Sequence, residues 1–115
     1  MPGEKILVVV STAEKGKALL ALNWAARLRE KELAPDVKVY LFGPVEELVA
    51  RGDREILDAL ERLYGLGVEV LACHGVAERG GFEEELKKVM GEERVTHVGR
   101  MIVERIREGY TPLVF

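Results

Sequence analysis

Apolar and polar residues alternate in blocks along the chain, and the blocks predict strands and helices in turn. The run Ile6–Val10 is short, continuous and rich in β-branched residues, which is typical of a strand covered on both faces. Segment 17–33 then carries apolar residues near helical spacing, with charged residues toward the other face. Pro35 is expected to end this helix, because the residue before a proline disfavours helical geometry.

The same alternation continues to the C-terminus. Asp53 is placed to cap a helix that starts at residue 54. Strands that alternate with helices at this spacing predict right-handed crossovers, and therefore an α/β fold: three layers, with a mainly parallel sheet of about five strands. At 115 residues, the range 1–115 fits a single domain. The remaining predicted strands are 37–42, 68–73, 95–98 and 113–115, and the remaining predicted helices are 46–50, 54–63, 82–90 and 99–108.

Composition and charge then narrow the class of protein. A hydrophobic fraction of 48% argues against disorder, and a net charge of −3 offers no basic surface for nucleic acid or anionic membranes. The five-residue run Ile6–Val10 is too short for a signal segment or a membrane span, and the single cysteine forms no internal disulfide. We therefore expect a cytoplasmic protein. One Asn, no Gln and many charged residues resemble the composition of thermophilic proteins.

Candidate chemistry lies at the carboxyl ends of the predicted strands, where open α/β sheets bind ligands. Three loops meet that condition, at 11–16, 43–45 and 73–81, and the third opens with Cys73. If a helix begins directly after this cysteine, its free amide hydrogens and dipole favour the thiolate, which is the nucleophilic form. His74 and Arg79 would add positive charge. A buried, unreactive cysteine that only fills space is the alternative interpretation.

Other chemistries find less support in the sequence. Cys73, His74 and His97 lack the paired spacings of zinc sites, so we expect no metal or other cofactor, and His97 is interpreted as a structural residue. Ser11 or Thr12 is expected to cap the first helix, since segment 11–17 lacks the glycine pattern of a phosphate-binding loop. No Ser–His–Asp arrangement or pair of catalytic carboxylates can be placed.

Two further patterns are interpreted as structural. Trp24 and Leu28 form a stripe that we assign to the core or to an oligomer interface. The run 83–85 of three glutamates, followed by Lys87 and Lys88, has a spacing that permits ion pairs on a solvated helix face.

The region around Cys73 resembles a known family. Leu71-Ala72-Cys73, separated by five residues from Arg79-Gly80, is similar to the cysteine loop of the DsrE/DsrF/TusD-like family, which includes the YchN-like proteins. The resemblance covers essentially the whole chain, since the family's first strand, first helix, terminal helix and closing strand match residues 5–10, 18–28, 99–104 and 112–115.

The resemblance implies a flavodoxin-like, layered domain that assembles into trimers or hexamers. Several family members accept a sulfane sulfur on this cysteine as a persulfide and pass it to a cysteine of another protein. It follows that Cys73 would carry the sulfur, with Arg79 and Gly80 in the loop behind it. Since this chain has no second cysteine, transfer would occur between molecules, from a donor protein to an acceptor protein.

We therefore predict a sulfur carrier or sulfurtransferase with Cys73 as its reactive residue. The alternative is a non-catalytic, oligomeric α/β module that binds a small anionic ligand or nucleotide at the same edge. The candidate binding or thiol-tuning residues are His74, Gly75, Arg79, Gly80, Ser11, Thr12 and His97.

Overall fold

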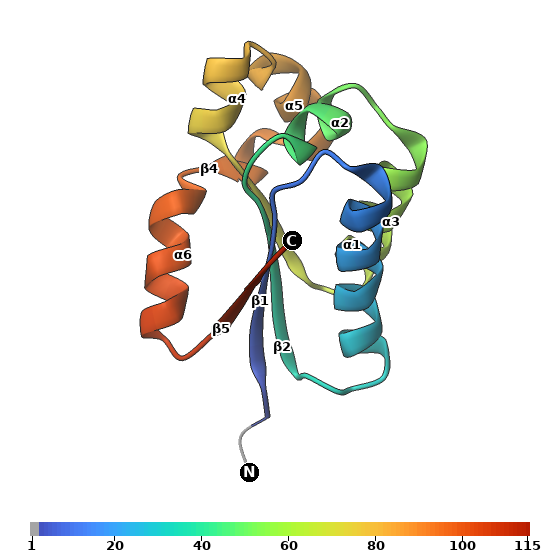
Figure 1. Ribbon diagram of the computed structural model, residues 1–115, viewed down its shortest axis with the longest axis vertical. Coiled ribbons are helices and arrows are strands. Elements are labelled where there is room, and N and C mark those ends of the chain that lie inside the picture. Colours follow the sequence, from blue (N-terminus) through green and yellow to red (C-terminus); the bar gives the residue numbers. More distant parts are fainter. Residues whose placement is uncertain (1–2) are drawn as a thin grey trace.

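Five parallel strands form one sheet in the order β4-β3-β2-β1-β5 (Figure 1). The computed structural model describes residues 3–115, so the first two residues of the predicted range 1–115 lie outside the described residues. The predicted α/β class, with about five strands in a mainly parallel sheet, is confirmed. The strands are β1 (Lys5–Val10), β2 (Asp36–Leu41), β3 (Glu69–Cys73), β4 (Val95–Thr96) and β5 (Thr111–Val114).

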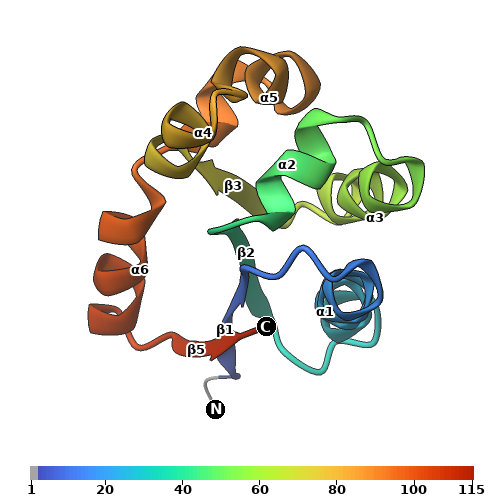
Figure 2. The same cartoon turned by 45° about the horizontal axis from the view of Figure 1, so that its top comes forward.

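The order of the strands decides which face each helix covers. From β1 to β4 the chain moves in one direction across the sheet, and it then returns to the far side of β1 to form β5. A right-handed crossover changes face when the direction reverses, so α6 lies alone opposite α1 and α3 (Figure 2). The helices are α1 (Lys15–Glu30), α2 (Val45–Ala50), α3 (Arg54–Gly65), α4 (His74–Gly80), α5 (Glu83–Met90) and α6 (Val98–Arg107), with a short 3₁₀ turn, η1 (Glu92–Arg94), before β4.

Each face of the sheet has its own hydrophobic cluster. The larger cluster packs one face of β1, β2 and β3 against α1, α2, α3 and α5. The smaller cluster lies under α6 and contains Leu7, Val9, Tyr40, Leu71 and Cys73 from the strands. Strands that are buried on both faces explain the continuous apolar runs in the sequence. No helix within residues 3–115 combines the length and the apolar character needed to cross a bilayer.

The first helix differs from its prediction at both ends. It begins at Lys15 because Glu14 is its N-cap: the Glu14 carboxylate accepts hydrogen bonds from the backbone N–H groups of Gly16 and Lys17. The predicted cap by Ser11 or Thr12 is therefore wrong. The helix also ends at Glu30, before Pro35, because Glu32 adopts a left-handed conformation with φ of 54°. The predicted cap of α3 is confirmed, since Asp53 accepts a hydrogen bond of 3.1 Å from the Ile56 N–H.

The segment after β3 also differs from its prediction. Residues 73–81 were expected to form a loop, whereas His74–Gly80 form the helix α4. Gly81 ends that helix in the left-handed conformation, with φ of 77°, and turns the chain into α5. The last two strands are shifted as well: β4 has two residues because α6 begins at Val98, and β5 spans Thr111–Val114.

Candidate functional site

The carboxyl ends of β1, β2 and β3 bring Ser11, Phe42 and Cys73 to the same edge of the sheet. The register pairs Leu41 of β2 with Val10 of β1 and with Ala72 of β3, so the three residues that follow lie at one level. Cys73 belongs to the cluster under α6, and Ser11 and Phe42 line a hollow on that same face. This edge of the sheet therefore carries the candidate residues Cys73 and Ser11.

Cys73 ends β3 and is the N-cap residue of α4, so a helix does begin directly after the thiol. The side chain makes no capping hydrogen bond and is 8% exposed, within the buried cluster that includes Leu71 and Val98. Gly75 borders the sulfur, because a Cβ at this position would lie 3.9 Å from Sγ. The lack of a side chain at Gly75 thus leaves space beside the sulfur.

A buried glutamate that the sequence analysis missed lies behind the cysteine. Glu46, in the first turn of α2, is fully buried, and its Oε2 accepts a hydrogen bond of 3.2 Å from the Gly43 N–H. Burial raises the pKa of Glu46 to about 8, although hydrogen bonds from the backbone of Gly43 and Cys73 oppose this shift. The second oxygen, Oε1, has no partner within residues 3–115. Through its hydrogen bond with Gly43, the carboxyl group thus holds the loop that follows β2.

The only signal for this position was a local one. Glu46 stands three residues after Gly43, which is the spacing at which an acidic side chain reaches back to a free N–H at the start of a helix. The apolar neighbours Val45 and Val49, both buried, mark α2 as a helix that packs on the sheet, but they do not reveal that Glu46 is buried with them.

His74, the first residue of α4, lies between two carboxylates. Its Nδ1 contacts Oε2 of Glu83 on α5, and its Nε2 lies 3.9 Å from Oε2 of Glu78, one turn further along α4. Burial raises the pKa of Glu83, but the hydrogen bond and charge of His74, together with Lys87 at 3.4 Å, outweigh burial and lower that pKa overall. Glu83 is therefore not on a purely solvated helix face, as its sequence pattern suggested, whereas the predicted ion pairing is confirmed by Lys87.

His97 comes from a different element and lies beside His74. It is the exposed N-cap residue of α6, and its ring centre lies 5.6 Å from that of His74, with the two rings nearly perpendicular at 78°. The structure thus brings together two histidines that are 23 positions apart in the sequence. In the sequence, the only indication of this contact is that both histidines lie near the carboxyl ends of predicted strands.

Arg79 and Gly80 lie on the last turn of α4, and both are exposed. Arg79 is therefore almost two helical turns beyond the cysteine rather than in a loop folded behind it. Gly80 has a packing role: a Cβ at this position would lie 2.3 Å from the ring of Phe82. Neither residue is joined to Cys73 by a hydrogen bond or ion pair among the described residues.

Ser11 and Thr12 organise the loop after β1. The backbone of Ser11 accepts a hydrogen bond from the Val45 N–H, and its N–H donates to the Phe115 carbonyl. The Thr12 hydroxyl accepts a hydrogen bond of 3.0 Å from the Glu14 N–H. Both residues therefore fix the path of this loop at the sheet edge.

An apolar hollow of about 470 Å³ lies between α6 and the sheet, next to this edge. Around it the surface stays apolar: Val103 and Ile106 of α6 are each 46% exposed, and Val114 of the edge strand β5 is 70% exposed. The lining residues are Val9, Ser11, Phe42, Ile102, Ile106, Pro112 and Val114.

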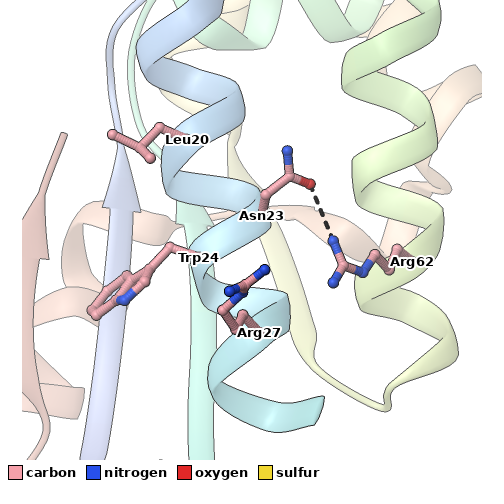
Figure 3. Close-up of a pocket in the computed structure, with 5 residues that line it drawn as sticks. All are labelled: Leu20, Asn23, Trp24, Arg27 and Arg62. Atoms are coloured by element: carbon pink, nitrogen blue, oxygen red, sulfur yellow. Dashed lines mark hydrogen bonds between the residues drawn. The ribbon is translucent and has the colours of Figure 1, made fainter. Parts of the chain in front are cut away.

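A second hollow, of about 340 Å³, lies on the outer side of α1, facing α3 (Figure 3). Trp24 and the exposed Leu20 form its apolar wall, and Arg62 reaches across from α3 to bond Asn23 and Glu30. Trp24 also packs at a tilt on Phe115, with ring centres 6.0 Å apart. Leu28 is buried, so the predicted stripe is divided between the core and this surface.

Comparisons with known proteins identify the fold. No protein-family profile matches the chain, and no curated protein is similar to it in sequence. Among solved structures, the ychN protein of E. coli superimposes with a TM-score of 0.71 at 19% identity, over 96% of this chain and 99% of that protein. The chain shares the fold of the ychN protein.

Two other structures with this fold superimpose over nearly their whole length. The conserved protein of unknown function BT1422 from Bacteroides thetaiotaomicron gives a TM-score of 0.80 at 17% identity, covering 96% of this chain and 95% of that one. The protein of unknown function MTH1491 from Methanobacterium thermoautotrophicum gives 0.73 at 19% identity, covering 97% and 99%. At such low identity these likenesses establish the YchN-like fold alone.

Proposed function

We propose that the chain is a sulfur carrier or sulfurtransferase in which Cys73 holds a sulfane sulfur as a persulfide. In the first step, the Cys73 thiolate attacks the outer sulfur of a donor persulfide. A new S–S bond forms at Cys73, the donor's S–S bond breaks, and the donor leaves as a thiolate. An acceptor thiolate then attacks the outer sulfur of this persulfide. The S–S bond at Cys73 breaks, and Cys73 is released as a thiolate. The two exchanges are balanced without any oxidant or reductant.

The observation that carries the proposal is the place of the only cysteine. Cys73 ends a parallel strand at the carboxyl edge, directly before a helix, with the side-chain-free Gly75 beside its sulfur. Ligands of open α/β sheets bind at this edge. The resemblance of the Cys73 region to the DsrE/DsrF/TusD-like family and the shared fold of the ychN protein agree with this role.

The burial of Cys73 sets a condition on the mechanism. At 8% exposure, the sulfur needs an approach path, which the space at Gly75 or a movement of α4 away from the end of β3 would supply. A narrow approach of this kind favours delivery by a specific partner over exchange with any passing thiol.

Intact mass tests the proposal directly. Reduced protein is incubated with inorganic polysulfide as the sulfane-sulfur donor and is weighed before and after dithiothreitol. We expect the gain of one sulfur, lost on reduction, and no gain in Cys73→Ser. An equal gain in Cys73→Ser, or no gain in the unaltered protein, would overturn the proposal.

A second candidate function is favoured by the burial of the same residue. If Cys73 only fills space in the cluster under α6, the chain is a non-catalytic α/β module that binds a small anionic ligand or nucleotide at the strand carboxyl ends. Tight protection of the thiol against alkylation until the protein unfolds would support this candidate and exclude the first.

We further propose that the chain forms a homo-oligomer through the surface made by α6 and β5. This surface combines an apolar hollow, the exposed side chains of Ile106 and Val114, and the unpaired edge of β5. Such edges are normally covered or charged, because they pair readily with other chains. Light scattering after size exclusion should give a multiple of the 12.8 kDa chain mass, reduced to one chain in Val114→Lys. A monomeric unaltered protein would contradict this assembly.

A further inference from the structure

The imidazole of His74 has a carboxylate oxygen on each side. Nδ1 contacts Glu83, and Nε2 faces Glu78. A neutral imidazole carries one N–H, so only one of its nitrogens can donate a hydrogen bond. When Nδ1–H donates to Glu83, the lone pair of Nε2 points toward a second anion. In this arrangement Nε2 and the Glu78 carboxylate offer two donor atoms on the same side of the ring.

The separation of the two atoms suits a metal ion. Nε2 of His74 and Oε2 of Glu78 are 3.9 Å apart, which is too long for a hydrogen bond. Zinc binds histidine nitrogen and carboxylate oxygen at about 2.0–2.1 Å, so one ion can bridge two atoms between about 3.3 Å and 4 Å apart. His74 and Glu78 are at positions i and i+4 of α4 and therefore share one face of the helix.

His97 supplies an independent third group from the start of α6. Two imidazoles on one tetrahedral metal have ring centres roughly 5 Å apart, because each centre lies about 3.2 Å from the ion. The observed distance between the ring centres of His74 and His97 is 5.6 Å. The side chains of His97 and Glu78 are exposed and can adjust to an ion without disturbing the core.

Glu83 completes the arrangement from behind. Ligating histidines generally donate their second ring N–H to a carboxylate, which fixes the tautomer and orients the ring. Glu83 makes this contact with Nδ1 of His74, and it is itself held by Lys87 at 3.4 Å. The donor atoms of His74, Glu78 and Glu83 all lie within 4.8 Å of one another.

We infer that Nε2 of His74, the carboxylate of Glu78 and the imidazole of His97 bind a zinc ion, with Glu83 as the residue that orients His74. Water fills the fourth position. The ion links the start of α4 to the start of α6, and so joins the ends of β3 and β4 at the edge that carries Cys73. The site requires no reaction at the cysteine, and the inference stands or falls independently of sulfur transfer.

The test uses the full chain with Cys73→Ser, so that the thiol cannot bind the metal. Zinc chloride is titrated against a chromophoric chelator, and cobalt(II) absorption in the visible range reports tetrahedral coordination. We expect one ion per chain. His74→Ala, Glu78→Gln and His97→Ala should each weaken binding by at least about tenfold, and Glu83→Gln by about 10–100-fold. Glu84→Gln, an exposed neighbour with the same charge change, should leave the affinity unchanged.

Three results would overturn the inference: no one-to-one binding of zinc, an unchanged affinity in Glu78→Gln, or an unchanged affinity in His97→Ala. Glu78 and His97 are exposed, so their variants retain the fold even if His74→Ala does not. Failure of zinc binding alongside sulfur uptake by the unaltered protein would reject this site and leave the proposed function in place.

Discussion

The two faces of the sheet differ in what covers them. The face under α1, α2, α3 and α5 holds the larger cluster, which is built almost entirely from aliphatic residues. The face under α6 has one helix, a smaller cluster, and polar groups among its buried residues, such as Tyr40, whose hydroxyl donates to Glu69. The first face therefore provides most of the stability of the chain.

The second face carries the features that a function needs. Cys73, the apolar hollow and the uncovered edge of β5 all lie on the side of α6. A helix of which only Val98 is buried leaves an apolar hollow between itself and the sheet, whereas the hollow on the four-helix side lies outside α1, away from the strand ends. The larger part of the core and the candidate functional features thus lie on different faces of one sheet.

A matched pair of aliphatic residues, one from a helix on each face, provides the largest test of this division. Leu63 of α3 is fully buried, whereas Ile106 of α6 is 46% exposed. Leu63→Ala should lower the free energy of unfolding by about 2–5 kcal/mol, because it leaves a cavity in the larger cluster. Ile106→Ala should lower it by less than about 1 kcal/mol in the monomer. Urea unfolding measures both, and equal losses would contradict the division.

Glu46 is a buried glutamate among the apolar residues of the larger cluster, and its effect on the free energy of unfolding depends on pH. Burial raises its pKa from 4.5 to about 8 in the folded protein. Between these values the folded state keeps a proton that the unfolded state has lost, so the free energy of unfolding falls as pH rises from about 4.5 to 8. Glu46→Gln removes this loss and should be more stable than the unaltered protein by a few kcal/mol at pH 8, with little difference near pH 4.5.

Urea unfolding at pH 4.5, 6 and 8 checks this prediction. The two stability curves should separate progressively as the pH increases. Parallel curves would show that the carboxyl group is solvated or paired in the folded state, and Glu46 would then have no special link to the strand ends.

Two glycines of α4 allow smaller tests, one at the larger cluster and one beside Cys73. In Gly80→Ala the new methyl group would lie 2.3 Å from the ring of Phe82, which packs against the larger cluster. The ring must shift, so we expect a loss of about 1–3 kcal/mol in the free energy of unfolding. Thermal unfolding followed by circular dichroism measures the loss, and an unchanged midpoint would contradict the contact.

Gly75→Ala should leave the stability unchanged but should make Cys73 less accessible. Its methyl group would make an ordinary contact, 3.9 Å from the sulfur of Cys73, and alanine is the better helix former by about 1 kcal/mol. The stability should therefore be kept, while alkylation of Cys73 by iodoacetamide should slow about threefold or more because the approach is narrower. An unchanged rate would mean that reagents reach the sulfur from another side.

Hydrophobic periodicity was sufficient to predict the sheet and most helices, because burial on both faces leaves continuous apolar runs such as Ile6–Val10. It did not predict α4, because segment 73–81 was assigned to a loop. There, the tertiary contacts of Ala77 and the hydrogen bond between His74 and Glu83 stabilise a short helix with weak intrinsic propensity. The N-cap of α1 was predicted at the wrong residue, because Ser11, Thr12 and Glu14 all carry side-chain oxygens that can accept hydrogen bonds from the start of a helix.

The site was predictable only in part. The position of Cys73 follows from the strand pattern, because a strand end is a local feature. The meeting of His74 with His97, and the burial of Glu46, depend on how α4, α6 and α2 pack, which no local pattern encodes. Long-range contacts between short helices were therefore the missing information.

The rate of thiol alkylation in the folded protein, compared with the rate in denaturing urea, tests the central claim most directly. A carrier must expose Cys73 without unfolding, so the account predicts a folded-state rate within about tenfold to a hundredfold of the unfolded rate. A thiol sealed in the core would react only through global unfolding. Protection that equals the full unfolding equilibrium, measured in the same buffer, would contradict the assignment of Cys73 as the sulfur-bearing residue.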